Sequence, residues 1–232
     1  MPQQKKIPYS AFLNLFCWIS LTLVNSLLPT VTAAEAKKQP KTETGKEYEP
    51  EMVKIPAGSS RVGSNSGDND EKPVHRVTLP SFELSKNEVT RGQFAIFIEE
   101  TGYQTDAEKN SGDKKGCFAY RGGTNYGWVR GMSWRYAGFD QGNDHPVICV
   151  SHNDALAYID WLSTKTGKSY RLPTESEWEY AVRGGSNDRY SFGNDEEELC
   201  LHANGADMSL KEKLPNWPWA TMSCTDGHTF TA

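Results

Sequence analysis

The sequence predicts an α+β domain with unusually little regular secondary structure. Three observations indicate this class: short stretches of alternating apolar residues, helices with complete N-terminal caps and terminal glycines, and long connections rich in glycine, asparagine and aspartate. At 232 residues, with 37% hydrophobic and 24% charged residues, the chain has the composition of a folded globular protein. Its length allows one sizeable domain.

The N-terminal residues are typical of a secretory signal peptide. Lys5 and Lys6 precede an apolar stretch, residues 11–28, and small residues follow at 31–36. A membrane anchor is the alternative, because the apolar stretch approaches the length that spans a bilayer. Polar interruptions in the stretch and the alanines after it favour export. We therefore expect residues 1–34 to be removed, leaving a secreted or periplasmic protein without a membrane attachment.

The remaining chain divides into a linker and one domain. Residues 35–50 are rich in Lys, Glu, Thr and Pro, which is typical of a solvated linker, and residues 51–232 form the domain. The whole chain has a formal net charge of −5, and loss of the signal peptide makes it more acidic. Because no cluster of basic residues remains, we expect no nucleic-acid partner.

Short strands and well-capped helices make up the predicted elements. The strands are residues 52–56, 74–79, 82–89 and 147–150, and a polar turn covers residues 63–72. Each predicted helix has a hydroxyl residue as N-cap and a glycine at its end: Thr90 to Gly102, Ser151 to Gly167, and Thr174 to Gly184. Gln93 and Glu177 lie where a capping box places its second member.

Residues 103–145 form a long stretch with little periodicity. A loop of this length inside a compact domain is generally functional, although packing duties alone explain it equally well from sequence. Its aromatic residues Trp128, Trp134 and Tyr136 are either core anchors or walls of a groove, and core placement is favoured for any one of them. Trp128 and Trp134 are the candidate binding residues.

Four cysteines remain after the predicted cleavage: Cys117, Cys149, Cys200 and Cys224. An even number in an exported chain favours disulfides, for which four cysteines allow three connectivities. We prefer Cys117–Cys149 and Cys200–Cys224, because each bond closes an irregular segment. A zinc site is the alternative, but no Cys-x-x-Cys spacing supports it.

Six segments match one protein family in the family's own order. They are residues 52–58 (MVKIPAG), 72–77 (KPVHRV), 87–94 (NEVTRGQF), 101–108 (TGYQTDAE), 145–147 (HPV) with 150–151 (VS), and 170–185 (YRLPTESEWEYAVRGG). Through them the chain resembles the formylglycine-generating enzyme family, also called the sulfatase-modifying-factor family. The resemblance implies a compact α+β fold with elements similar to C-type lectins.

The resemblance also implies a reaction and a cofactor. Family members use oxygen and copper to oxidise a cysteine in a sulfatase polypeptide to formylglycine, and thiolates suit Cu(I). Their copper-binding cysteine pair lies in the last part of the domain, whereas this sequence ends at Ala232 without those motifs. Cys200 and Cys224 lie too early to be that pair. We therefore assign no catalytic residue and expect a C-terminally incomplete domain, inactive as given.

One family metal site maps onto this chain in part. The resemblance implies a structural calcium held by the side chains of Asn204 and Asp226 and the carbonyls of Gly205 and His228. Calcium takes such mixtures of side-chain and backbone oxygens. The alternative is a pair of Asx turns, which Asn-Gly and Asp-Gly sequences favour.

Two functions follow from these expectations. The first is an exported formylglycine-generating-type oxidase domain with a polypeptide partner such as a sulfatase. The second is a non-catalytic, lectin-like binding module that uses residues 103–145 to hold a protein or cell-wall ligand, since a fold does not fix a function.

Overall fold

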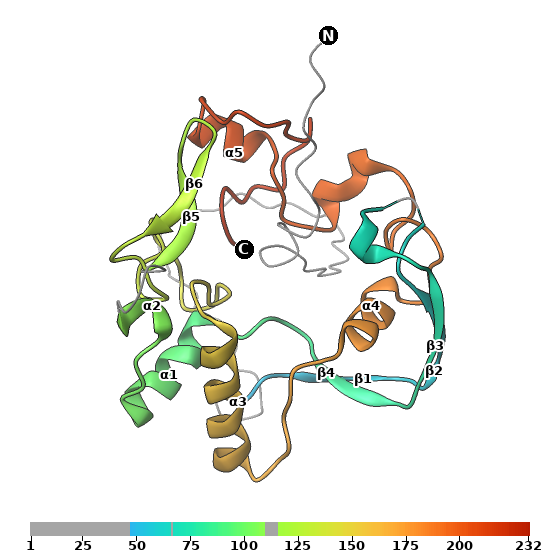
Figure 1. The fold of residues 1–232 in the computed structure, drawn as a ribbon, viewed down its shortest axis with the longest axis horizontal. Helices are drawn as coiled ribbons and strands as arrows, with labels where there is room; N and C mark the ends of the chain where they lie inside the picture. Colours follow the sequence, from blue (N-terminus) through green and yellow to red (C-terminus); the bar gives the residue numbers. More distant parts are fainter. Residues whose placement is uncertain (1–46, 66, 110–115) are drawn as a thin grey trace, which may run out of the picture.

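The computed structural model describes residues 47–65, 67–109 and 116–232 (Figure 1). The predicted signal peptide and most of the predicted linker lie outside these residues. The strands are β1 (Met52–Ile55), β2 (Gly58–Val62), β3 (His75–Leu79), β4 (Phe82–Ser85), β5 (Cys117–Gly122) and β6 (Asn125–Val129). The helices are α1 (Arg91–Thr101), α2 (Asp106–Lys109), α3 (His152–Thr166), α4 (Glu175–Arg183) and α5 (Met208–Lys213), with 3₁₀ turns η2 (Asn69–Glu71) and η3 (Glu196–Leu201). The α+β class with little regular structure is confirmed.

The first four strands form one interrupted antiparallel ribbon. β1 pairs with β4 and β2 pairs with β3, and the register is the same in both ladders. Pro56 and Pro80 lie in the gap between the ladders, where neither can donate a backbone hydrogen bond. The predicted strands at 52–56, 74–79 and 82–89 are found, the last one shorter than expected. The prediction missed β2, whose sequence Gly-Ser-Ser-Arg-Val carries little apolar signal.

All three predicted helices are confirmed, together with their boundaries. The hydroxyls of Thr90, Ser151 and Thr174 each accept the backbone N–H of the residue three positions on, whose side chain bonds back. Each helix ends at a glycine with a left-handed backbone, where a side chain would be strained. These caps are local, because each joins residues three positions apart.

An aromatic core lies between α1 and α3. Phe94 and Phe97 from α1 pack against Tyr158 and Leu162 from α3, and all four side chains are buried. Trp134 joins them with a ring-centroid distance of 5.4 Å to Phe94 and an exposed fraction of 4%. Of the two placements that the sequence left open for Trp134, the structure therefore shows the core one.

The helix α4 anchors the ribbon through its acidic residues. Glu179 accepts the backbone N–H of Gly63 at 3.1 Å through both carboxylate oxygens, and it also pairs with Arg183. Glu177 is buried and receives two hydrogen bonds, of 2.5 and 2.7 Å, from the guanidinium of Arg171. Those bonds, with the backbone N–H of Thr174, lower the pKa of Glu177 to about 2. The carboxylates of Glu177 and Glu179 thus stabilise the fold through hydrogen bonds and ion pairs.

The predicted strand at 147–150 is not formed. Val147 donates one backbone hydrogen bond to Val89, and Pro146 forms an isolated bridge with Thr90. Cys149 has a φ of 62°, which lies outside the extended region, so the chain cannot continue as a strand there. The disulfide Cys117–Cys149 joins this segment to the start of β5.

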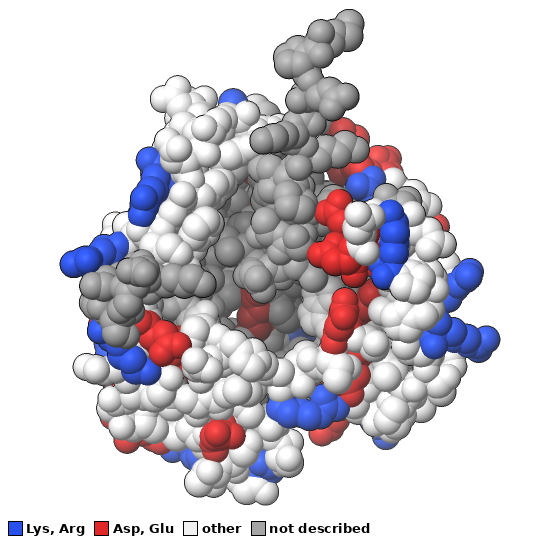
Figure 2. Space-filling model, viewed as in Figure 1, with Lys and Arg blue, Asp and Glu red and all other residues white. Residues whose placement is uncertain are grey.

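The stretch 103–145 is more regular than predicted, because it contains α2 and the hairpin β5–β6. One face of the hairpin is entirely aromatic: Phe118, Tyr120, Tyr126 and Trp128. Trp217 and Trp219 cover one end of this face, while Phe118 and Trp128 stay 60% and 37% exposed. Most of the surface over β5 and β6 carries no charge (Figure 2).

No helix in the described part of the chain combines the length and the apolar composition needed to cross a membrane.

Candidate metal-binding site

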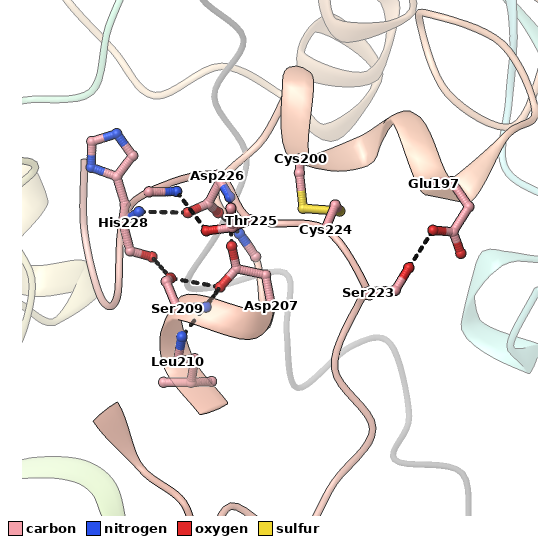
Figure 3. Close-up of a disulfide and its surroundings, with 12 residues drawn as sticks. Glu197, Cys200, Asp207, Ser209, Leu210, Ser223, Cys224, Thr225, Asp226 and His228 are labelled. Atoms are coloured by element: carbon pink, nitrogen blue, oxygen red, sulfur yellow. Dashed lines mark hydrogen bonds between the residues drawn. A yellow bond between two sulfur atoms is a disulfide. The ribbon is translucent and has the colours of Figure 1, made fainter. Parts of the chain in front are cut away.

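Two loops meet beside the disulfide Cys200–Cys224, where the predicted calcium residues lie (Figure 3). One loop leads from η3 into α5, and the other follows Cys224. The backbone N–H of Met208 donates to the carbonyl of Cys224 at 3.2 Å, so the loops are joined by hydrogen bonds as well as by sulfur. The covalent bond limits how far the two loops can separate.

Asp207 organises the junction from a fully buried position. Its Oδ1 accepts the backbone N–H of Ser209 at 2.8 Å, the hydroxyl of Ser209 at 2.6 Å and the backbone N–H of Leu210 at 3.2 Å. Its Oδ2 accepts the backbone N–H of Asp226 at 2.6 Å. One carboxylate therefore caps α5 and also holds the second loop. The sequence analysis missed this residue, although Asp-x-Ser at a helix start is an N-cap pattern.

Asp226 binds both loops in the same way. Its Oδ2 accepts the backbone N–H of Gly205 at 2.9 Å, and its Oδ1 accepts that of His228 at 2.7 Å. The carbonyl of His228 accepts the hydroxyl of Ser209 at 2.9 Å. The ring of His228 points away from both carboxylates (Figure 3), so His228 offers this site its backbone. Asn204 donates its amide to the carbonyl of Phe230 at 3.2 Å.

The two carboxylates concentrate negative charge at the junction of the loops. Burial raises the pKa of Asp226, and the charge of Asp207 adds to this rise. Burial also acts to raise the pKa of Asp207, but hydrogen bonds from Ser209, Asp226 and Leu210 outweigh it, so that the net shift is downward. Within the described residues neither carboxylate forms an ion pair with Lys or Arg. A bound cation would offset this charge.

The residues present fit a calcium ion in the type of their donors. The structure brings Asn204, Gly205, Asp226 and His228 together, since Asp226 contacts Gly205 and His228 directly and Asn204 precedes Gly205. They offer one carboxylate, one amide oxygen and two carbonyls, a set that calcium accepts. No group of three or more His, Cys, Asp or Glu side chains in the described residues is arranged to hold a metal. Calcium here would rely on amide and carbonyl oxygens.

Comparison with known proteins identifies the family to which the chain belongs. Residues 35–228 match the family described as the sulfatase-modifying factor enzyme 1-like domain. The chain belongs to this family. Its relatives include the formylglycine-generating enzyme of Mycobacterium tuberculosis, which is 36% identical over 173 residues, 63% of this chain and 56% of that protein. The chain spans about half the length of the curated relatives it matches.

The relatives also include proteins that are named as inactive formylglycine-generating enzymes. The inactive C-alpha-formylglycine-generating enzyme 2 of Bos taurus is 32% identical over 189 residues, 73% of this chain and 61% of that protein. Among solved structures, PvdO from Pseudomonas aeruginosa has a TM-score of 0.57 at 28% identity, covering 84% of this chain and 66% of that one. These likenesses establish family and fold.

The described cysteines do not fit the copper site that the family resemblance implies. They form Cys117–Cys149 and Cys200–Cys224, so the preferred pairing is confirmed and the zinc alternative is wrong. A sulfur held in a disulfide is not the thiolate that binds Cu(I). No oxidative step is therefore assigned to these four residues.

Proposed function

We propose that this chain is the scaffold portion of an exported formylglycine-generating-type oxidase that acts on a cysteine of a sulfatase polypeptide. The observation that carries the proposal is the family match over residues 35–228. Relatives at 36–38% identity are named formylglycine-generating enzymes. The two disulfides support an oxidising compartment, either outside the cell or in the periplasm.

In this proposal calcium stabilises the junction of the two C-terminal loops. Asn204, Gly205, Asp226 and His228 hold the ion, which supplies positive charge beside two carboxylates. Asp207 does not bind the ion; it positions Asp226 by accepting its backbone N–H. The role of the metal is structural, and the reacting cysteine of the substrate lies elsewhere.

We propose further that residues 47–232 do not carry out the oxidation alone, since the four described cysteines are paired. The test incubates the purified chain with a sulfatase-motif cysteine peptide, oxygen and Cu(I), and detects the aldehyde by mass spectrometry. A second sample carries, as a fusion, the part of the Mycobacterium tuberculosis relative that this chain does not match.

The expected result is an aldehyde only with the fusion. If the unfused chain formed the aldehyde, the proposal that residues 47–232 do not carry out the oxidation alone would be wrong. A fusion that gives a cooperative thermal transition but forms no aldehyde would contradict the oxidase proposal itself.

The second candidate function is a non-catalytic binding module, and the aromatic face of β5–β6 favours it. Phe118, Tyr126 and Trp128 are 60%, 40% and 37% exposed on that face. Exposed aromatic side chains of this kind bind protein or cell-wall ligands with little loss of conformational entropy. Replacing Trp128 with alanine should then abolish binding to a peptide or glycan array while leaving the thermal midpoint nearly unchanged. Unchanged array binding would exclude this face.

A further inference from the structure

The sheet β2–β3 places two arginines directly opposite each other. Arg61 and Arg76 are register partners, so both side chains project from the same face of the ribbon, and both are exposed. Like charges at directly opposed positions destabilise an antiparallel pair. Lys and Arg side chains protrude on the side of the molecule where Figure 1 places β2 and β3 (Figure 2).

Nothing in the described part of the chain neutralises these two charges. Neither Arg61 nor Arg76 belongs to any of its ion pairs. The helix α4 packs against β2, and its carboxylate Glu179 is already bound to Arg183 and to the backbone of Gly63. The two guanidinium groups are therefore available to an anion from outside the chain.

A hollow of about 450 Å³ lies beside the arginine pair. The polar residues that line it are Ser59, Ser60, Arg61, His75, Arg76 and Asn187. The hydroxyls of Ser59 and Ser60 already bond the hydroxyl of Thr78 and the carbonyl of Arg61. The two guanidinium groups and the amide of Asn187 carry N–H donors, and no acidic side chain lines the hollow. Asp188, next to Asn187, is turned toward its own loop, where its Oδ1 accepts the amide of Asn194 at 2.8 Å. The charge of this lining is therefore positive, which favours an anion.

We propose that this hollow binds the oxyanion of a small phosphate or sulfate monoester. Guanidinium groups bind such oxyanions through paired hydrogen bonds, and two of them balance a dianion. The volume lies within the range of roughly 300 to 1,000 Å³ that is usual for ligand sites, which leaves room for an organic group on the ester. The site lies apart from the calcium loops and does not depend on the proposed oxidase function.

The test measures affinity by calorimetry for the full chain at constant ionic strength set with chloride. The probes are phenyl phosphate, phenyl sulfate, inorganic phosphate and inorganic sulfate. The variants are Arg61→Gln and Arg76→Gln, with Arg130→Gln as the matched control, because Arg130 is an exposed arginine outside the hollow.

One of the two esters should bind wild type and the control equally, and each variant in the pair should bind it about tenfold more weakly. Comparison of the two esters identifies the oxyanion. If Arg61→Gln bound the ester as tightly as wild type, or if neither ester bound wild type in the chloride buffer, the proposed site would be wrong. Inorganic ions binding as tightly as the esters would overturn the ester assignment.

The variant Arg61→Glu separates lost binding from lost folding. It places opposite charges across the strands, so it should raise the thermal midpoint while removing binding.

Discussion

The backbone N–H of Asp226 donates a 2.6 Å hydrogen bond to the Oδ2 of the fully buried Asp207. Two carboxylates from separate loops therefore share one junction, beside the disulfide Cys200–Cys224. Such a junction is most stable when its hydrogen bonds are complete and its negative charge is offset. The hydrogen bonds come from the chain, and we propose that the offsetting charge comes from calcium.

Asp207→Asn should destabilise the fold by about 2 kcal/mol, because an amide nitrogen cannot accept the hydrogen bonds that one carboxylate oxygen now accepts. Chemical denaturation of the two proteins measures the difference. Asp160→Asn is the matched control, since Asp160 is exposed on α3 and its carboxylate has no hydrogen bond within the described residues. Equal losses in both variants would show that Asp207 does not organise the junction.

Replacing both Cys200 and Cys224 with serine should cost about 3 kcal/mol, because the bond closes a chain segment with a sequence separation of 24. It should also weaken calcium binding. Replacing Cys117 and Cys149, with a separation of 32, should cost a similar amount but leave calcium affinity unchanged, since that bond lies outside the junction. Calorimetry with calcium distinguishes the two; equal calcium affinities in both variants would count against the site.

Glu177 should make stability depend on pH. Its folded pKa is lowered to about 2 from an ordinary 4.5, so its contribution is present above pH 4.5 and is lost as the pH falls toward 2. The contribution is about 1 to 2 kcal/mol, because the exposed side of Arg171 is screened by solvent. Denaturation of wild type and Glu177→Gln between pH 7 and pH 2.5 should show a difference that shrinks across this window. A difference that does not vary with pH would contradict the ion pair.

The two tryptophans proposed from sequence should behave differently. Trp134→Ala should cost about 3 to 5 kcal/mol, because the side chain is 4% exposed and packs against Phe94. Trp128→Ala should cost about 1 kcal/mol or less, because Trp128 lies on the open part of the aromatic face. Thermal denaturation compares the two variants directly, and similar losses would place Trp128 in the core as well.

Local rules predicted the parts of the fold that local chemistry determines. Thr90, Ser151 and Thr174 cap their helices through bonds that span only three residues, so the sequence states them in full. The family resemblance indicated the four residues of the proposed calcium site, which come from two separate loops, Asn204 and Gly205 from one and Asp226 and His228 from the other, and no periodicity connects these loops. The pairing of the four cysteines was predicted because each of the two bonds closes an irregular segment of the chain.

Tertiary geometry determined what the sequence analysis missed. The left-handed backbone of Cys149 removes a strand that the apolar run Val147–Val150 favoured. The polar strand β2 exists because it pairs with β3 and contacts α4. Asp207 has an N-cap pattern in the sequence, but its role in joining two loops depends on the backbone N–H of Asp226. Each depends on residues distant in sequence.

Titration of the purified chain with calcium tests the proposed metal site most directly. Calorimetry should show saturable binding, and calcium should raise the thermal midpoint of wild type and Asp160→Asn. Asp226→Asn, which keeps the shape of the side chain but removes its charge, should fold and lose most of the affinity. Calcium binding that is absent in wild type, or unchanged in Asp226→Asn, would contradict the site.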